Sequence, residues 1–333
     1  MQPMQTQSLR ATATELLAPL IAGHSHCALL DFQNHGNVGD SAIWLGELAW
    51  LERSGCRIRH VCSELDYDAR SLRRAVGEGP ILLSGGGNFG DVWPAHQVFR
   101  ERVLADFPAN RIIQLPQSIH FTKCENAERA RSALAAHRDF HLLARDRTSL
   151  AVAETRLGIR AQLCPDMVHM LDRPAFDGPR SYRLLVLSRD DHEKRPTPEH
   201  AFDRARRDDC LVIDWLGQPN LPEERLYRRA RRLVRTRWLP AAPFERRALH
   251  YTRVLATKRI DWGCRLLGSA RALVTDRLHA CLLGWLGGSR VYFVDNNYGK
   301  LSSYVESWLG DDANLVACRG FEEALQRADA DLG

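Results

Sequence analysis

Two copies of the pentapeptide Gly-Asn-x-Gly-Asp, at residues 36–40 and 87–91, could hold a ligand close to the main chain. Each copy follows an apolar run, at 27–32 and at 81–84, and precedes a segment with helical periodicity. Glycine lets a backbone approach a ligand closely, and the free N–H groups of a helix N-terminus bind anions. A tight turn that only caps a helix explains one copy equally well, but the pair favours a pocket. We interpret both copies as strand-to-helix turns at the carboxyl edge of a parallel sheet.

Basic and proton-carrying side chains follow two other expected strands. Arg145 comes after the apolar segment 140–144, and the triplet Arg277-Leu278-His279 follows the apolar segment 272–275 and opens a helix. A guanidinium suits bidentate binding of a carboxylate or phosphate, and histidine is the natural proton carrier near neutral pH. A local Arg-Asp ion pair and a capped helix with a core histidine are the structural alternatives.

Polar side chains also follow two further strands. Gln117 and Ser118 come after Pro116, which is expected to end the strand 111–115. Lys300 follows the strand 290–295 and either adds a positive charge to the pocket or lies in solvent, as most lysines do. No cluster of His, Asp and Cys has the spacing of metal ligands. We therefore expect neither a metal nor a cofactor.

Alternating strand and helix patterns must position these residues. In the first half the expected strands lie at 27–32, 58–62, 81–84, 111–115, 140–144 and 161–163, with helices between several of them. This order predicts a parallel sheet with right-handed crossovers. A breaker-rich segment at 173–180 reads as a linker, after which the pattern restarts. We predict an α/β fold with one domain at 1–172 and a second at 181–333, and we expect the active site in the cleft between the two.

The composition of the 333-residue chain restricts its class. The nine cysteines include no C-x-x-C pair, which argues against a disulfide framework and a zinc site and favours a reducing compartment. Residues 1–10 lack the apolar core of a signal peptide. No apolar run approaches the roughly 20 residues of a membrane span. The sequence therefore predicts a soluble cytoplasmic protein.

The segment from Arg225 to Arg237 contains seven arginines and is expected to form a basic amphipathic helix. Its expected apolar face consists of Leu226, Ala230, Leu233, Val234 and Trp238. One interpretation is peripheral contact with an anionic membrane surface or with a lipid-linked pyrophosphate acceptor. An ordinary surface helix explains the pattern as well. Nucleic acid is not expected as a partner, because no aromatic side chains are interleaved with the arginines.

Taken together, these motifs resemble the polysaccharide pyruvyl transferase family. The resemblance is carried by the segments 36–43, 84–91, 115–118, 144–146, 164–166 and 275–280. It extends from about residue 31 to 308 and is strongest with the bacterial exopolysaccharide members. The segment 190–259 contains no matching motif.

The resemblance implies a fold similar to the GT-B glycosyltransferases, with two Rossmann-like domains facing each other across a cleft. It also implies phosphoenolpyruvate as the donor. The acceptor would be a sugar of a growing exopolysaccharide or of a lipid-linked repeat unit. The product would be a pyruvate ketal, with release of phosphate. The family's phosphoenolpyruvate-binding arginine falls on Arg145, its Arg-Leu-His motif on Arg277, Leu278 and His279, and a further lysine on Lys300.

These positions lead to expected roles. His279 would be the general acid, and Arg145 and Arg277 would bind the donor and stabilise developing charge. The expected acceptor side or pocket wall consists of Asn37, Asp40, Gly86, Gly87, Asn88, Asp91, Gln117 and Ser118. Two other functions remain open: a nucleotide-sugar-dependent glycosyltransferase of GT-B type, and a non-catalytic assembly protein at a membrane surface.

Overall fold

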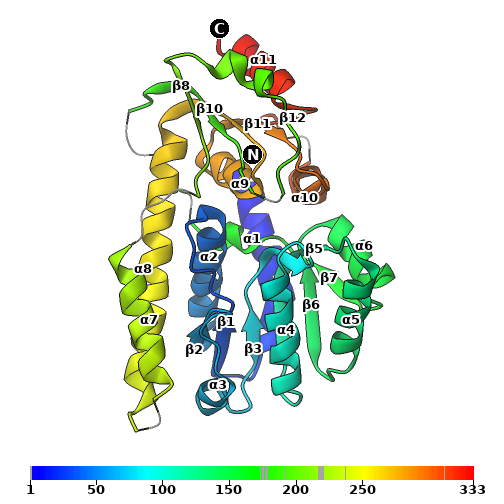
Figure 1. Cartoon of the computed structure of the whole chain (residues 1–333), viewed down its shortest axis with the longest axis vertical. Helices are drawn as coiled ribbons and strands as arrows, with labels where there is room; N and C mark the ends of the chain where they lie inside the picture. Colours follow the sequence, from blue (N-terminus) through cyan, green and yellow to red (C-terminus); the bar gives the residue numbers. More distant parts are fainter. Residues whose placement is uncertain are drawn as a thin grey trace.

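The computed structural model describes residues 2–172, 174, 176, 179–191, 193–216, 221–236, 238–310 and 312–333. In these ranges the chain forms two parallel β-sheets covered by helices (Figure 1), which confirms the expected α/β class. Part of the expected linker at 173–180 lies outside the described residues, so the domain limits stay a prediction. Within the described part of the chain, no helix has the length and apolar character needed to cross a membrane.

The first sheet has the strand order β2-β1-β3-β5-β6-β7, and β4 pairs with β5 beyond the end of β3. Its strands are β1 (His26–Leu30), β2 (Arg57–Cys62), β3 (Ile81–Leu83), β4 (Gly86–Gly90), β5 (Ile112–His120), β6 (Phe140–Ala144) and β7 (Ala161–Leu163). Most of their residues are buried, as expected for a parallel sheet with helices on both faces.

Helices cover both faces of the first sheet. One core joins it to α1 (Gln2–Ile21) and α2 (Val38–Ser54). The other core joins it to α3 (Ala69–Val76), α4 (Pro94–Asp106), α5 (Cys124–Ala135) and α6 (Arg147–Thr155). A short 3₁₀ helix (Met167–Met170) follows β7. The helices α1 and α3 were not anticipated from the sequence.

The second sheet has the strand order β12-β11-β10-β8-β9. Its strands are β8 (Tyr182–Leu187), β9 (Cys210–Ile213), β10 (Ala270–Thr275), β11 (Arg290–Val294) and β12 (Leu315–Cys318). The helices α9 (Leu278–Gly287) and α10 (Lys300–Trp308) pack on one face, and α11 (Phe321–Leu332) and a 3₁₀ helix (Glu199–Ala205) pack on the other.

Helices α7 (Pro222–Val234) and α8 (Ala241–Gly268) lie side by side along one edge of the molecule, and α8 extends past both sheets (Figure 1). Although both follow β9 in the chain, α7 and the first part of α8 pack on the first sheet: Tyr227 and Leu255 share a core with Trp44 of α2. Buried Glu245 of α8 contacts His60 of β2, with 2.8 Å between Oε1 and Nδ1.

The expected apolar face of α7 is wrong in part. Leu226 is 43% exposed and Trp238 is 91% exposed, whereas Tyr227 and Arg231 point inward. Arg231 can be buried because its guanidinium is ion-paired with Asp66, at 2.7 Å between Nε and Oδ1, and with Glu245. The inward stripe of the helix thus combines apolar packing with a buried charge cluster. Arg237 lies outside the described residues.

Two further local predictions are corrected. The second pentapeptide is not a strand-to-helix turn: Gly86–Gly90 is strand β4, and α4 begins only at Pro94. Pro116 does not end its strand, because β5 continues to His120. The register of β5 against β6 shifts between Gln114 and Gln117, and Pro116 lies in this irregularity, where the missing N–H is tolerated.

Candidate active site

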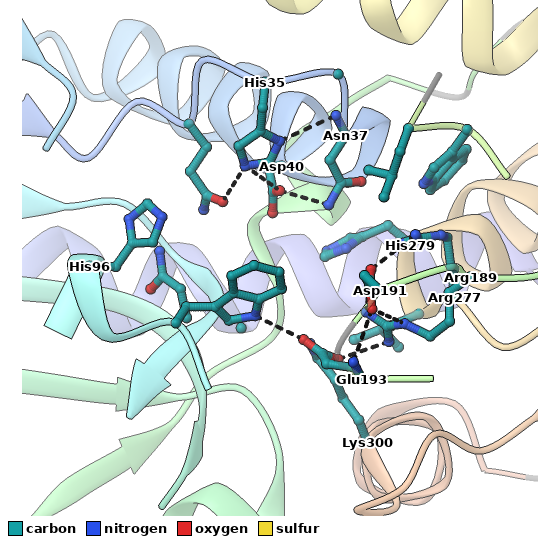
Figure 2. A pocket seen from close by; sticks show the side chains of 18 residues that line it. His35, Asn37, Asp40, His96, Arg189, Asp191, Glu193, Arg277, His279 and Lys300 are labelled. Carbon is teal, nitrogen blue, oxygen red and sulfur yellow. Dashed lines mark hydrogen bonds and ion pairs between the residues drawn. The ribbon is translucent and has the colours of Figure 1, made fainter. Parts of the chain in front are cut away.

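A cavity of about 350 Å³ lies among loops that follow strands of both sheets (Figure 2). Figure 2 shows His35, Asn37 and Asp40 on one side and Arg277, Asp191 and Glu193 on the other. The remaining lining residues are Gln33, Gly36, Gly87, Asn88, Trp93, His96, Arg189, Trp215, Leu216, Leu278, His279 and Lys300. The carboxyl ends of parallel strands are where such folds place ligand sites.

The first pentapeptide forms the N-terminus of α2, as expected. Asn37 is the N-cap, and its Oδ1 accepts a hydrogen bond from the N–H of Gly39 at 3.0 Å. Its Nδ2 donates to Oδ2 of Asp40 at 2.7 Å. The cap therefore fixes the Asp40 carboxylate in the first turn of the helix, at the wall of the cavity.

The second sheet contributes Arg277, which is the N-cap residue of α9 and follows β10. Its guanidinium donates two hydrogen bonds to Asp214, at 2.6 Å from Nε and 2.7 Å from Nη2. Nη2 also donates to Asp191 at 3.0 Å. Arg277 is thus held in one orientation by two carboxylates at the cavity.

His279 lies one helical position beyond Leu278 and contacts a buried carboxylate. Its Nε2 is 3.2 Å from Oδ2 of Asp166, which also accepts a hydrogen bond from Nη1 of Arg145 at 2.7 Å. Asp166 and Arg145 are both fully buried. Burial acts to raise the pKa of Asp166, but the positive charges of His279 and Arg145 outweigh it and hold that pKa well below its ordinary value. Asp166 is therefore an anion that links two of the predicted catalytic residues, His279 and Arg145.

Arg145 keeps one nitrogen of its guanidinium uncommitted. Nε donates to Ser118 Oγ at 2.9 Å and Nη1 binds Asp166, whereas Nη2 is buried and has no hydrogen-bond partner among the described residues. A Cβ atom on Gly87 would lie 3.1 Å from Nη2 and only 2.2 Å from Nζ of Lys300. Glycine at position 87 thus lets the main chain pass directly beside two cations.

Lys300 is largely covered, with 10% of its side chain exposed, and lies beside Glu193 with 3.5 Å between Nζ and Oε2. Burial lowers the pKa of Lys300, against the opposing effect of Glu193. Glu193 also pairs with Arg189 at 2.8 Å and accepts a hydrogen bond from Trp93 Nε1 at 3.2 Å. Burial acts to raise the pKa of Glu193, but Lys300 and Arg189 hold it well below its ordinary value. The cations of the cavity are therefore neutralised by carboxylates of the protein itself.

The sequence profile of the polysaccharide pyruvyl transferase family matches residues 37–298, which is more than half of the chain and contains Asn37, Arg145 and His279. The chain belongs to this family. Pyruvyl transferase 1 of Schizosaccharomyces pombe is 31% identical over 310 residues, covering 86% of this chain and 71% of the relative. EpsO of Bacillus subtilis, which also carries the name of a pyruvyl transferase, is 28% identical over 298 residues and covers 88% of each chain.

A solved structure of an uncharacterised protein from Klebsiella pneumoniae has a similar fold. Its TM-score is 0.60 at 15% sequence identity, and the match covers 94% of this chain and 99% of that one. At this identity the likeness supports the fold alone.

The structure of this pyruvyl transferase family member brings most of the predicted site residues together. Asn37, Asp40, Gly87 and Asn88 of the expected acceptor side line the cavity with Arg277, Leu278, His279 and Lys300 of the expected donor side. Gly86, Gln117, Ser118 and Arg145 are not among its lining residues. Of these, Gln117 donates to Asn88 Oδ1 at 2.8 Å, and Ser118 contacts Arg145. Their roles in binding or catalysis stay predictions.

Asp91 has a different setting from the other predicted residues. It does not line the cavity, and its carboxylate accepts hydrogen bonds from the N–H groups of Thr122 and Lys123 at 2.7 and 2.8 Å. Burial acts to raise the pKa of Asp91, but these hydrogen bonds outweigh the effect of burial, so the pKa of Asp91 is lowered. In this arrangement Asp91 joins the end of β4 to the start of α5.

Sequence reasoning missed His96 and the loop residues Arg189, Asp191 and Glu193. The loop lies directly after β8, so the rule that polar residues at strand ends form the site could have found it. His96 gives no such signal, because it lies within the first turn of α4. Its Nδ1 is 2.8 Å from Oδ1 of Asp31. Burial acts to lower the pKa of His96, but the negative charge of Asp31 outweighs burial, so the pKa of His96 is raised.

Asp31, Glu64 and His96 are also the group of side chains in the described ranges whose spacing fits metal ligands, with their ligand atoms within 4.8 Å of one another. Asp31 and His96 already bond each other, and Asn88 Nδ2 donates to Asp31 at 3.1 Å. Two members of the group are therefore joined to the second glycine segment through Asn88.

Proposed function

We propose that the protein transfers pyruvate from phosphoenolpyruvate to two hydroxyl groups of one sugar, with release of phosphate. The sugar would belong to an exopolysaccharide or to a lipid-linked repeat unit. The observation that carries this proposal is the convergence of His279, Arg277 and Lys300 on one cavity in a member of this family. We further propose that the two sheets are the centres of two Rossmann-like domains, arranged as in GT-B enzymes with the cavity between them.

The donor would bind at the cation-rich side of the cavity. Phosphoenolpyruvate carries a carboxylate and a phosphate, which require several cationic or N–H donors. Arg277, Arg189 and Lys300 line the cavity, and each is paired with a carboxylate of the chain. Donor anions would therefore compete with Asp191 and Glu193 for these cations, so binding includes a rearrangement of ion pairs. Arg145 Nη2, beside Gly87, offers an N–H group that needs no such exchange.

The chemical steps follow from the donor's enol phosphate. His279 donates a proton to C3, and C2 becomes electrophilic as the methyl group forms. One sugar hydroxyl attacks C2, and the C–O bond to phosphate breaks. The second hydroxyl then attacks C2 and closes the ketal ring. Two hydroxyl protons are released in total: one restores the proton given to C3, and the other leaves with phosphate.

The acceptor would occupy the side of the cavity formed by the first sheet. Asn37, Asp40 and Asn88 present amide and carboxylate groups there, which are suited to sugar hydroxyls. Of these residues, Asp40 is the candidate general base, because a carboxylate can accept the proton of an attacking hydroxyl. This assignment leaves the cationic side of the cavity free for the donor.

The proposal is tested by phosphate release from phosphoenolpyruvate in the presence of candidate lipid-linked saccharides. In D₂O the product methyl group should carry one solvent deuterium, because the proton delivered to C3 comes from an exchangeable group. The same acceptors with UDP-sugars serve as the control for a glycosyltransferase. Thermal stabilisation and turnover with UDP-sugars but not with phosphoenolpyruvate would refute pyruvyl transfer.

A further inference from the structure

The outer side of α7 carries a row of arginines that the fold does not use. We call Arg225, Arg228, Arg229, Arg232 and Arg235 the basic face. All five side chains are exposed, and none forms an ion pair with any residue in the described ranges. Unpaired like charges repel one another in free protein, so such a row is stabilised by an anionic partner.

The orientation of α7 is fixed by its opposite side. Tyr227 donates a hydrogen bond to Asp66 at 2.8 Å, and buried Arg231 pairs with Asp66 and Glu245. Ala230 and Val234 complete the buried stripe. Because this inner side is anchored, the helix cannot rotate its arginines toward the protein, and the basic face is a permanent property of the surface.

Exposed apolar side chains accompany the arginines. Leu226 is 43% exposed within the same helix, and Trp238 and Leu239 are 91% and 40% exposed where the chain turns into α8. An exposed tryptophan beside arginines is the combination that binds the interface of a lipid bilayer, because the indole ring enters the headgroup region while the cations meet phosphates. A soluble polyanion alone would not require this apolar group.

The basic face begins beside the cavity. Glu224 in the first turn of α7 pairs with Arg259 at 3.0 Å, and Arg259 also donates to Oδ1 of Asn34 at 3.0 Å. Asn34 lies between Gln33 and His35, which line the cavity. The N-terminal end of the basic face is therefore linked to the wall of the cavity.

We propose that the basic face and Trp238 dock the protein on the surface of an anionic lipid bilayer. The docking itself does not depend on the proposed transfer reaction, so each can fail without the other. If the acceptor is lipid-linked, docking would also bring the cavity to the plane in which the acceptor diffuses. Each basic residue near an anionic bilayer strengthens binding by about fivefold, so several arginines and an indole suffice for reversible attachment.

The test uses the full chain in flotation with vesicles of pure phosphatidylcholine or of phosphatidylcholine mixed with phosphatidylglycerol. We expect binding to the anionic vesicles only, and weaker binding as salt concentration rises. Replacing Arg225, Arg228, Arg229 and Arg232 by Gln should weaken binding by about 100-fold or more. These side chains are exposed and form no ion pair within the described residues, and Arg228 Nε donates only to the carbonyl oxygen of Glu224 in its own helix. The variant should therefore fold normally, which its thermal unfolding checks.

A matched control replaces four exposed arginines outside α7, which are Arg131, Arg138, Arg160 and Arg271, by Gln. This variant loses the same charge but should keep vesicle binding. The further variant Trp238→Ser should weaken binding at every salt concentration, since it removes the apolar contribution. Equal binding to neutral vesicles, or equal loss in both arginine variants, would overturn the proposal. So would binding to polyphosphate or single-stranded DNA without binding to vesicles, which would make the face a site for soluble polyanions.

Discussion

The imidazole Nε2 of His279 and the carboxylate of Asp166 are 3.2 Å apart, although the two residues are 113 positions apart in the chain. Asp166 follows β7 of the first sheet, and His279 lies in the first turn of α9, which follows β10 of the second. The same carboxylate binds Arg145. One buried anion therefore orients both His279, the candidate general acid, and Arg145, a candidate residue for binding the donor.

Replacing Asp166 by Asn should reduce kcat by about 100-fold, because the neutral amide holds neither partner as an ion pair. Leaving Arg145 buried without its anion should also cost stability, by about 3–5 kcal/mol. A double-mutant cycle separates the two effects. If Asp166 acts through His279, the change should reduce kcat little further in a His279→Ala background. Full additivity of the two losses would show that Asp166 does not act through His279.

The change Gly87→Ala should raise the KM for phosphoenolpyruvate by about tenfold with little loss of stability. The new Cβ would lie 2.2 Å from Nζ of Lys300, which is the mobile end of a long side chain and can move aside. The matched control is Gly320→Ala, where a Cβ meets no atom within 4 Å. Steady-state kinetics and thermal unfolding of both variants check the prediction, and an unchanged KM would show that Lys300 does not bind the donor.

The change Glu193→Gln should move the basic limb of the pH profile of kcat/KM to lower pH. Burial lowers the pKa of Lys300 and Glu193 opposes this effect, so removing the carboxylate lowers the pKa further. Lys300 then loses its proton, and its attraction for the donor, at a lower pH. The control Glu199→Gln removes a carboxylate that pairs with Arg206 on the exposed surface and should leave the profile unchanged. A basic limb that does not move would exclude Lys300 as the titrating group.

Stability should fall as pH rises because of Glu47 in α2. Burial raises the pKa of Glu47 from 4.5 to about 8, although the Gly85 N–H and the Ser84 hydroxyl donate hydrogen bonds to its carboxyl group. The folded protein therefore keeps a proton there that the unfolded chain loses above pH 4.5. Between pH 6 and 8 this difference costs about 2–3 kcal/mol of the free energy of unfolding. Urea unfolding of Glu47→Gln should show this loss reduced, and an identical pH dependence would contradict the assignment.

Much of the site could be predicted from the sequence because strand ends meet at one edge of a parallel sheet. This rule, together with the family resemblance, selected Asn37, Arg277 and His279, which the structure brings to one cavity. The turn at Asn37 also formed as expected, because its side chain can cap the helix that follows.

The second pentapeptide shows where local pattern fails. Its residues have the same types as the first copy, but its Gly90 and the preceding Gly86 have φ of 127° and 126°, which lets the segment extend as β4. A Cβ on Gly90 would lie 1.7 Å from the carbonyl oxygen of His120, so pairing with β5 requires glycine. This requirement comes from the neighbouring strand and cannot be read from five residues. The place of Arg189 and Glu193 after β8 marks them as candidates, but their pairing with Lys300 and Trp93, which are distant in sequence, cannot be read from the local pattern.

The packing of α8 has a consequence for how the molecule can be divided. Its Glu245 binds His60 of the first sheet, while Leu267 near its other end belongs to the core of the second. A polypeptide that stopped at Asp172 would lack α7 and α8, and Trp44 and Leu51 would lose the apolar neighbours supplied by these helices. Such a fragment would expose a hydrophobic surface and should aggregate or bind chaperones. A fragment or fusion protein that contains the first sheet should therefore include α7 and α8.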